Sequence, residues 1–488
     1  MALKHLIAAG LASSVVLTAK AQTTASACAS PIAPQHATPS VAPGFRVEVV
    51  ANGLRDPRGI VFDGEGGLLV VEQEHGISRL RLTGEGPCVR VEGDVESVIE
   101  DESLNHGIAI SQDGNTLYAS SSTTAYAWDY DASQGQTTSD PRDVIQGMEG
   151  DGHVTRTLLL SQLVPDMLLV SRGSMSNLDL QALDKTTGVS TIKAFNISNM
   201  TSSAYDHASS GLLLGWGLRN SVGIAEHPIS GGIYSVENSV DNIERSGETI
   251  NQNNPGEELN FHGYLNGTTS DVQGGNYGYP SCYAAWNVSE IPNFDGMTGE
   301  QFAIGEQNAT LNDTFCQDDH IAPRLTFAAH MAPLDIKFNP NGTAAWVTFH
   351  GSWNREVPIG YKLSLVEFDS NGSPTAPENS TDAATDIVAN PDLSECPGSC
   401  FRPVGLAWDS QGRLFMSSDS TGEIYVITKE DGSGVADVSE AANDGSNPSP
   451  TPSGGAPSPT GTGAAGRRWS VGSGSYWAAG AAMIGAMV

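Results

Sequence analysis

The sequence predicts an all-β protein folded as a six-bladed β-propeller. Short β-rich segments, joined by turns rich in Asp, Asn, Gly or Pro, recur as one pattern six times along the chain. The repeats begin at Gly59, Gly107, Thr157, Val222, Leu334 and Val404. Alternating apolar residues joined by such turns are typical of β-hairpins, and a ring of hairpin repeats protects their edges. The alternative, a β-sandwich with unrelated hairpins, stays open at this point.

Composition supports a turn-rich β protein and excludes one class of partner. Only 16% of the 488 residues are charged, and Gly and Pro number 55 and 26. Lys and Arg total 24 against 56 Asp and Glu, a formal net charge of −32. Such a charge repels the phosphates of nucleic acids and the headgroups of anionic lipids. We therefore expect no nucleic-acid partner.

The first residues have the layout of a secretory signal. Lys4 precedes an apolar stretch at residues 6–17, and Ala19-Lys20-Ala21 has the small-x-small pattern of a cleavage site. The stretch is shorter than the ~20 apolar residues that a membrane helix needs. We expect residues 1–21 to be a signal peptide, residues 22–40 an N-terminal extension, and the protein to be secreted.

The expected secretion leads to predictions for the cysteines and for the N-x-S/T triplets. An even number of cysteines in an oxidising compartment predicts three disulfides, although six cysteines allow 15 pairings. We expect the local pair Cys396–Cys400, which leaves Cys282–Cys316 and Cys28–Cys88. Nine N-x-S/T triplets predict a glycoprotein. They lie at Asn196, Asn199, Asn266, Asn287, Asn308, Asn312, Asn341, Asn371 and Asn379.

The repeats predict one propeller domain over residues 41–430. Residues 45–51 form a spare strand that would close the ring by joining the last blade. The fourth repeat must carry a long insertion, because the next one starts only at Leu334. We expect this insertion, at about residues 235–324, to supply loops over the channel. Its aromatic residues either stack a sugar ring or form a small core of their own; they are Tyr279, Tyr283 and Trp286.

The C-terminal part has a composition that does not support a packed core. Residues 431–476 are rich in Ser, Gly, Pro, Ala and Thr, which predicts a disordered stalk. Residues 477–488 are apolar and follow small residues, the layout of a glycolipid-anchor signal that would attach the protein to a membrane or cell wall. The alternative, an apolar end to a disordered tail, stays open.

Cationic side chains stand at or just before every repeat start. In a propeller the first strand of each blade lines the central channel, so these residues should gather around one axis. They are Arg58, His106, His153 with Arg156, Arg219 with Asn220, His330, and Arg402. A basic collar in an acidic protein predicts an anionic ligand, because arginine binds carboxylates through two hydrogen bonds.

Six stretches of the chain resemble the soluble pyrroloquinoline-quinone (PQQ) sugar dehydrogenases. This family comprises glucose and sorbosone dehydrogenases and the fungal secreted pyranose dehydrogenases. The stretches are GDGHVTRTLLL from Gly150, WGLRNSVGIAEHP from Trp216, NNPGEELN from Asn253, GGNYGYPSCY from Gly274, HGSWNREVPIGYK from His350 and CPGSCFRPVGLAWD from Cys396. The resemblance implies a six-bladed propeller, in agreement with the repeats. It also implies PQQ, a tricarboxylate, as cofactor.

The resemblance assigns roles to the residues of the collar. His153 matches the family's general base, with His106 as the rival, and neutral histidine suits this task near neutral pH. Arg219 would polarise the quinone oxygen that gains charge, which makes it a second catalytic residue. Further cofactor contacts are expected from Arg58, His106, Asn220, His330, His350, Arg355 and Arg402.

The family also implies calcium, which binds hard oxygen donors. One ion would use backbone carbonyls at Gln252 and Asn253, where the bacterial glucose enzymes have a Gly-Pro pair. A second ion would use the Glu258 carboxylate and the Tyr277 carbonyl. The alternative for Glu257 and Glu258 is that both are solvated turn carboxylates.

The leading hypothesis is a PQQ- and calcium-dependent dehydrogenase of a pyranose or aldos-2-ulose-type sugar. The sequence contains no C-x-x-C-H haem motif, so electrons would pass to an external acceptor, either a haem protein or an oxidative polysaccharide-cleaving enzyme. One alternative is a calcium-dependent lactonase of the six-bladed type, which would need an acidic metal centre. The other is a non-catalytic glycan-binding propeller.

Overall fold

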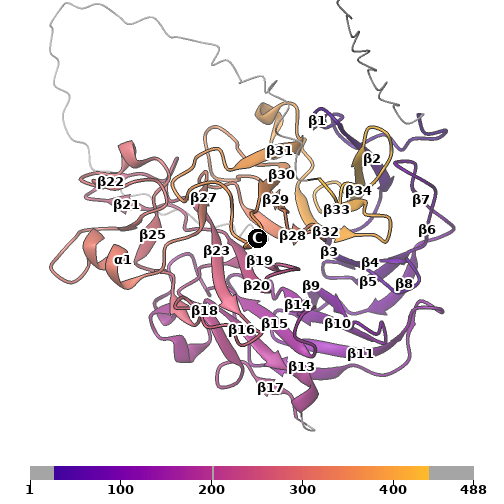
Figure 1. Cartoon of the computed structure of the whole chain (residues 1–488), viewed down its shortest axis with the longest axis horizontal. Coiled ribbons are helices and arrows are strands. Elements are labelled where there is room, and N and C mark those ends of the chain that lie inside the picture. Colours follow the sequence, from indigo (N-terminus) through magenta and orange to yellow (C-terminus); the bar gives the residue numbers. More distant parts are fainter. Residues whose placement is uncertain (1–26, 201–202, 439–488) are drawn as a thin grey trace, which may run out of the picture.

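Six small sheets surround a central axis in the computed structural model, which describes residues 27–200 and 203–438 (Figure 1). The predicted fold class, an all-β six-bladed propeller, is confirmed. The first three blades, each listed from the axis outward, follow the first three repeats. Blade 1 contains β3 (Pro57–Phe62), β4 (Leu68–Glu72), β5 (Gly76–Leu80) and β8 (Glu96–Glu100). Blade 2 contains β9 (Leu104–Ile110), β10 (Thr116–Ser121), β11 (Ala125–Asp131), β13 (Arg142–Gln146) and β17 (Tyr205–Asp206). Blade 3 contains β14 (Leu158–Leu160), β15 (Met167–Arg172), β16 (Thr191–Asn196), β18 (Leu212–Trp216) and β24 (Gly275–Asn276).

The other three blades complete the ring. Blade 4 contains β19 (Ser221–Glu226), β20 (Gly232–Glu237), β23 (Glu257–Tyr264) and β27 (Leu325–Phe327). Blade 5 contains β28 (Pro333–Phe338), β29 (Ala344–Phe349), β30 (Lys362–Glu367), β31 (Ala384–Ala389) and β1 (Ser40–Val41). Blade 6 contains β32 (Pro403–Trp408), β33 (Leu414–Ser418), β34 (Glu423–Lys429) and β2 (Phe45–Ala51). Every inner strand begins at or near the repeat start found in the sequence.

The ring is closed by the strand that the sequence left without a hairpin partner. β2 pairs antiparallel with β34, and Phe45 stands opposite Lys429 in their register. Strands from the two ends of the propeller therefore share blade 6. The prediction that residues 45–51 join the last blade is confirmed.

Most of the core lies between the blades, and one small cluster joins the inner strands of blades 4, 5 and 6. Each gap between neighbouring blades holds one cluster of buried apolar side chains. Successive side chains of a strand point to opposite faces, so each second strand supplies both of its gaps. In β4, Leu68 and Val70 face blade 6, whereas Leu69 and Val71 face blade 2. This explains why the second strands are apolar throughout instead of alternating.

The inner strands approach each other so closely that they require glycine. A Cβ on Gly59 would lie 2.3 Å from the His106 carbonyl oxygen, and one on Gly405 would lie 2.5 Å from the Arg58 carbonyl oxygen. Both contacts are shorter than van der Waals distance. Gly59 and Gly405 thus let the inner strands of blades 6, 1 and 2 pack closely against one another.

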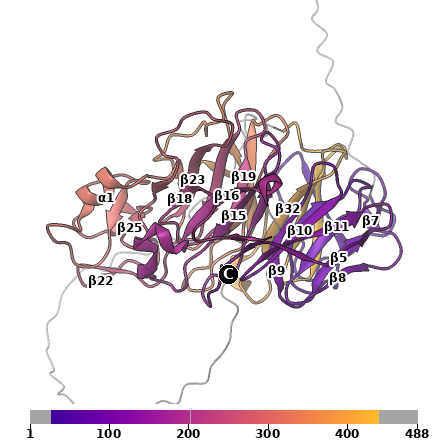
Figure 2. The same ribbon diagram turned by 90° about the horizontal axis from the view of Figure 1, so that it is seen from below.

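The insertion of blade 4 extends outward from the ring (Figures 1 and 2). Beyond β23 it contains β25 (Cys282–Ala284), β26 (Gln301–Ala303) and α1 (Asp313–Asp319). Tyr279 and Tyr283 are buried in its own apolar cluster, and Trp286 is half-buried against the core between blades 4 and 5. The small-core alternative is therefore correct for both tyrosines. The helix and hairpin of the insertion lie at the rim (Figures 1 and 2), whereas its Asn251 contacts His330. That the insertion supplies loops over the channel stays a prediction.

The remaining elements are short strands and 3₁₀ turns. They are β6 (Leu82–Thr83), β7 (Arg90–Val91), β12 (Gln136–Thr137), β21 (Glu244–Arg245), β22 (Glu248–Thr249) and the 3₁₀ turns η1 (Leu180–Leu183), η2 (Lys185–Thr187), η3 (Ile197–Asn199), η4 (Val288–Glu290) and η5 (Leu393–Glu395). All three expected disulfides form: Cys28–Cys88, Cys282–Cys316 and Cys396–Cys400. None of the nine sequon asparagines is buried.

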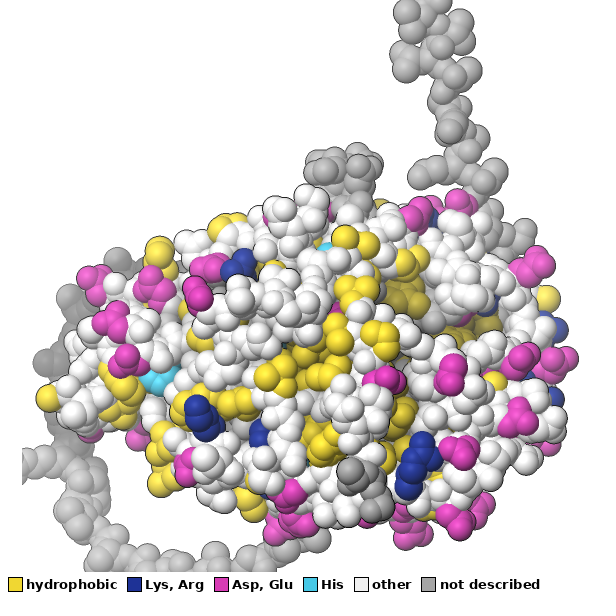
Figure 3. All heavy atoms as spheres, turned by 60° about the horizontal axis from the view of Figure 1, so that its bottom comes forward, with side chains coloured by type: hydrophobic (Ala, Val, Ile, Leu, Met, Phe, Trp, Pro, Cys, Tyr) yellow, Lys and Arg dark blue, Asp and Glu magenta, His cyan; other side chains and the backbone are white. Residues whose placement is uncertain are grey.

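Several expectations concern residues that the structure does not describe. The signal peptide, the stalk from residue 439 onward and the apolar tail lie outside the described residues. Within the described part of the chain, no helix combines the length and the apolar character needed to cross a bilayer. The face shown in Figure 3 carries many acidic and few basic side chains, as the net charge of −32 requires.

Candidate functional site at the mouth of the propeller

Two positions of each blade meet at one end of the central axis. In an antiparallel blade, the start of the first strand and the end of the second strand lie at the same end. We call this end of the propeller the mouth. The predicted collar residues reach it from the strand starts. His350 and the acidic residues Asp241 and Asp419 reach it from the segments that follow the second strands of blades 5, 4 and 6.

Asp419 is the centre of one buried cluster. Its carboxylate lies 2.6 Å from Arg58 Nη1 and 2.9 Å from His350 Nε2. Burial alone would raise the pKa of Asp419, but His350, Arg58 and Arg402 together hold it well below the usual range. Asp419 is therefore a permanent anion that offsets part of the collar charge.

Arg402 and His106 lie beside this cluster. Arg402 donates to the carbonyl oxygens of His350 and Gly351, at 3.1 and 2.9 Å, and its guanidinium lies over the Tyr361 ring. Burial and the charge of Arg58 lower the pKa of His106 well below its ordinary value. Burial, opposed by Asp419, lowers the pKa of His350 to about 4. Both imidazoles are therefore neutral at pH 7.

Asp241 is the centre of a second cluster. Its carboxylate lies 3.0 Å from Arg219 Nη2 and 3.2 Å from His330 Nδ1, and it accepts from Asn354 Nδ2 at 2.6 Å. The other His330 nitrogen lies 2.5 Å from the Asn251 carbonyl oxygen. Burial lowers the pKa of His330, but Asp241 and Glu257 outweigh it, so that the pKa is raised. Because both nitrogens face acceptors, the imidazolium form fits this site.

His153 is held in one orientation by Ser174. Its Nδ1 lies 3.0 Å from the Ser174 carbonyl oxygen and 2.9 Å from Ser174 Oγ. Burial and the charge of Arg219 lower the pKa of His153 to about 3. The neutral ring donates from Nδ1 to the carbonyl, which leaves the Nε2 lone pair free to accept a proton.

Asn220 lies against the same histidine. A Cβ built on Gly173 would lie 2.7 Å from both Asn220 Oδ1 and His153 Cβ. Gly173 follows β15, and its lack of a side chain lets these two residues approach each other. The structure therefore brings together His153 and Arg219, the two residues that the resemblance links to the reaction, and Asn220, an expected cofactor contact.

Two of the sequence-derived cations are engaged elsewhere. The Arg156 guanidinium donates to the carbonyl oxygens of His153, Thr155 and Met148 and is fully buried among them. The expectation that Arg156 lines the channel is wrong, since its role is to hold the loop that carries His153. Arg355 donates to the Ala329 carbonyl oxygen and to Asn253 Oδ1.

Asp241 and Asp419 were missed by the sequence reasoning. The basic collar was predicted from the starts of the inner strands, and neither aspartate precedes one. The sequence did contain a signal for Asp419. This residue directly follows β33, and the end of the second strand of a blade lies at the mouth. Ser174 follows β15 in the same way.

Unpaired nitrogen atoms at the mouth fit an anionic cofactor. Among the described residues, Arg58 Nε, His106 Nδ1 and His350 Nδ1 are buried without a hydrogen-bond partner. Buried polar groups normally have one. Carboxylate and carbonyl oxygens of a ligand such as PQQ would supply acceptors for Arg58 Nε and for an Nδ1–H of His106. His350 differs, because its Nε2–H donates to Asp419 and its Nδ1 is left as an acceptor.

A pair of buried carboxylates in blade 4 fits a divalent cation. Glu237 on β20 stands opposite Glu258 on β23, and both side chains are buried. Two oxygen atoms in this region, Gln301 Oε1 and Asn260 Oδ1, have no partner. Tyr277 is electrostatically coupled to both glutamates, and its carbonyl oxygen accepts from Gln301 Nε2 at 3.2 Å. Buried carboxylate, amide and carbonyl oxygens are donors that calcium prefers.

The other expected calcium position lies in the loop before β23. Asn253 Nδ2 donates to Glu290, and Gln252 Oε1 accepts from the Glu356 backbone amide. These side chains tie the loop to its neighbours. Any calcium ion in this loop would therefore contact backbone carbonyl oxygens, as the resemblance implies.

Comparison with known proteins matches most of the chain to one protein family. The family model described as TrAA12-like matches residues 39–430. The pyrroloquinoline quinone-dependent sugar dehydrogenase of Hypocrea jecorina is 48% identical over 408 residues, which cover 82% of this chain and 92% of that protein.

Solved structures agree with this match. The calcium structure of the Trichoderma reesei carbohydrate-active enzyme of family AA12 has a TM-score of 0.80 at 47% identity, covering 83% of this chain and all of that one (100%). The holo form of the pyranose dehydrogenase PQQ domain from Coprinopsis cinerea has a TM-score of 0.76 at 36% identity, covering 82% and 99%. These matches confirm the resemblance found in the sequence, and the chain therefore belongs to the TrAA12-like family.

Proposed function

We propose that this chain is a secreted, PQQ- and calcium-dependent dehydrogenase of a pyranose or aldos-2-ulose-type sugar. The observation that carries the proposal is the fixed His153, whose Nδ1 is bound by Ser174 and whose side chain lies near Arg219 and Asn220. The names of the relatives, a PQQ-dependent sugar dehydrogenase and a pyranose dehydrogenase PQQ domain, support the same chemistry.

Each residue of the mouth has a task in this proposal. PQQ, when bound, supplies the quinone that accepts a hydride from the sugar carbon. His153 Nε2 accepts the proton of the hydroxyl on that carbon, and burial keeps the imidazole neutral for this step. Arg219 presents positive charge where negative charge develops. Arg58, Arg402, His106, His350 and Asn220 would bind the cofactor. His330, also expected there from the sequence, has both nitrogens engaged by Asp241 and the Asn251 carbonyl oxygen.

Calcium is proposed at two places. Glu258, with Tyr277, would hold a structural ion within blade 4. Carbonyl oxygens at Gln252 and Asn253 would hold an ion next to the cofactor. The calcium structure of the Trichoderma reesei relative supports the assignment.

The proposal also covers secretion, glycosylation, the electron acceptor and attachment to the cell surface. Three disulfides and nine unburied sequon asparagines support secretion and glycosylation. We propose residues 41–430 as the catalytic domain, with a signal peptide before it and a stalk after it. Electrons would pass to a haem protein or an oxidative polysaccharide-cleaving enzyme, and a glycolipid anchor would attach the chain to the cell surface.

One experiment tests the proposal directly. Purified protein is titrated with PQQ in the presence of calcium, and the absorbance of bound PQQ is followed. Sugar and a redox dye are then added. We expect saturable PQQ binding and sugar-dependent bleaching of the dye. Hydrolysis of a lactone without PQQ would favour the lactonase, and sugar binding without PQQ binding would favour the non-catalytic propeller.

A further inference from the structure

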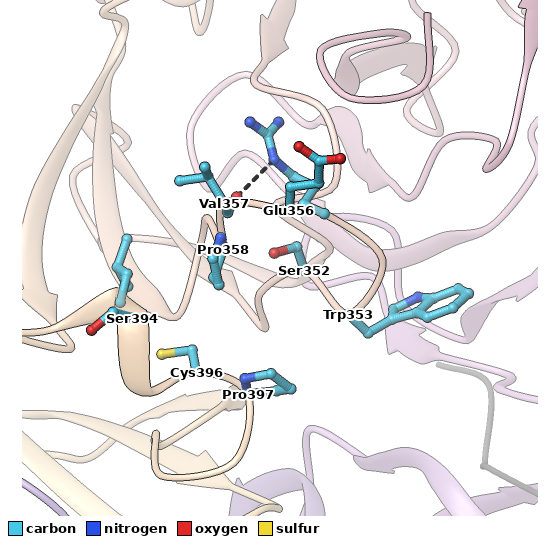
Figure 4. A pocket seen from close by; sticks show the side chains of 10 residues that line it. Ser352, Trp353, Glu356, Val357, Pro358, Ser394, Cys396 and Pro397 are labelled. Carbon is cyan, nitrogen blue, oxygen red and sulfur yellow. Dashed lines mark hydrogen bonds between the residues drawn. The ribbon is translucent and has the colours of Figure 1, made fainter. Parts of the chain in front are cut away.

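Trp353 is an exposed aromatic residue in the loop that follows β29. Its side chain is 59% exposed, whereas the other tryptophans that the structure describes are buried or half-buried. Figure 4 shows its indole extending away from Pro358 and Cys396, at one end of a groove of about 440 Å³. The groove is lined by the loop that follows β29 and by the segment around Cys396.

The loop around Trp353 is firmly bound to the propeller. The Ser352 amide donates to the Ile359 carbonyl oxygen at 2.9 Å, and the Ile359 amide donates to Ser352 Oγ at 3.0 Å. The Tyr361 hydroxyl donates to the Ser352 carbonyl oxygen. On the other side, Asn354 Nδ2 donates to Asp241 at 2.6 Å. The indole is therefore presented to solvent from a fixed backbone, which keeps the entropy cost of binding low.

The same contacts place Trp353 at the rim of the candidate site. Asn354, the next residue, contacts the aspartate that pairs with Arg219 and His330. His350, three residues before, pairs with Asp419. Consecutive Cα atoms are about 3.8 Å apart, so the Trp353 backbone lies close to both clusters of the mouth. Of the other aromatic candidates for this task, Tyr279 and Tyr283 are buried in the insertion, and Trp286 is half-buried against the core between blades 4 and 5.

We propose that Trp353 is the stacking platform for the pyranose ring of the substrate. One face of a pyranose carries C–H groups of slight positive charge, and the indole face is negative, so the two attract each other while apolar surface is removed from water. Stacking orients the ring without a hydrogen bond to any one hydroxyl. The hydroxyl of the reacting carbon is then free to face His153. This inference rests on the proposed function and names a residue that selects the substrate.

The test compares four forms of the holoenzyme loaded with PQQ and calcium. They are the wild type, Trp353→Ala, Trp353→Phe and Ile229→Ala. Ile229 is 65% exposed in the turn between β19 and β20, at the end of the propeller opposite the mouth, and serves as the matched control. Rates are measured with a redox dye and with D-glucose, D-galactose, D-xylose and D-glucosone.

We expect Trp353→Ala to raise KM about tenfold or more for the best sugar, with kcat and PQQ affinity nearly unchanged. Trp353→Phe should lie between it and the wild type, because a smaller ring still stacks. Ile229→Ala should match the wild type. Sugar should also protect part of the tryptophan fluorescence from iodide quenching in the wild type, and this protection should be lost in Trp353→Ala.

Three results would overturn the inference. A wild-type KM in Trp353→Ala, in an enzyme that binds PQQ and oxidises sugar, removes the stacking role alone. If Trp353→Ala loses activity only when a haem protein replaces the dye, Trp353 takes part in docking of the electron acceptor instead. A wild type that neither binds PQQ nor oxidises any of the four sugars removes the proposed function, and the stacking role falls with it.

Discussion

Glu237 and Glu258 stand directly opposite each other on β20 and β23, and both carboxylates are buried. Asn260 Nδ2 donates to both, at 3.2 Å to Glu237 and 2.9 Å to Glu258. Burial raises the pKa of both groups, and the charge of Glu258 raises that of Glu237 further. Two buried acids this close are stable only when they share a cation or hold protons.

Calcium and pH should therefore act on stability through this pair. Without calcium, the folded protein holds protons that the unfolded chain has already released above the ordinary pKa of 4.5. The free energy of unfolding should then fall as the pH rises from about 5 to 8. Calcium should reduce this dependence, because a bound ion replaces the protons.

Urea unfolding at several pH values, with calcium or with a chelator, measures this effect. Glu258→Gln serves as the comparison, since it removes one charge and keeps the shape. Its response to calcium should be clearly smaller than that of the wild type. An equal response in both proteins would place the stabilising ion elsewhere.

His153 and His106 should differ in their effect on the rate. His153→Ala should bind PQQ and calcium but oxidise sugar at least about a hundredfold more slowly, because a general base typically contributes 10² to 10⁴. His106→Ala should be milder. The measurements are kcat with a redox dye and a PQQ titration. The reverse order would make His106 the base, and small equal losses would mean that neither histidine takes the proton.

The pH dependence of the rate gives a further check on His153. Its pKa is lowered to about 3 by burial and Arg219, so the free enzyme holds this base neutral at all pH values well above 3. The plot of kcat/KM against pH should therefore show no ionisation of His153 between pH 5 and 8. A fall in kcat/KM below pH 6 that disappears in His153→Ala would indicate that His153 titrates there after all.

The arginines of the mouth should determine cofactor affinity. Arg219→Ala and Arg402→Ala each remove a charged donor, which costs about 2 to 3 kcal/mol, or ~30- to 150-fold in affinity for PQQ. Arg413→Ala is the matched control, because Arg413 is also a buried arginine, paired with Asp409 at the opposite end of blade 6. A PQQ titration that returns the wild-type affinity for both mouth variants would refute the anionic-ligand argument.

We expect Arg245 to be critical for the stability of the segment inserted in blade 4. Its fully buried guanidinium lies 2.7 Å from Asp313, and it donates to the Pro292 and Ala303 carbonyl oxygens. Arg245→Ala leaves a carboxylate without its partner and should lower the free energy of unfolding by about 3 to 5 kcal/mol. The exposed pair of Arg142 and Asp129 gives the control, and Arg142→Ala should cost less than about 1 kcal/mol. Equal losses in chemical denaturation would contradict the assignment of a structural role to Arg245.

The local pattern of the chain was sufficient to predict the architecture. Six hairpin repeats, the spare strand at residues 45–51 and the pairing of Cys396 with Cys400 all follow from residues that are near each other in the sequence. Strand periodicity and turn chemistry are short-range properties, so they are readable without the fold. The cations at the repeat starts were found for the same reason, because each inner strand begins at a recognisable place.

What surrounds those cations was decided only by the tertiary structure. Arg58 and Asp419 are 361 residues apart in sequence and 2.6 Å apart in space, since closure of the ring brings blade 6 beside blade 1. The burial of Tyr279, the exposure of Trp353 and the diversion of Arg156 into a loop likewise depend on which blade edges meet. Charge, burial and hydrogen bonding at the mouth are sums over six distant segments, and no single segment carries that information.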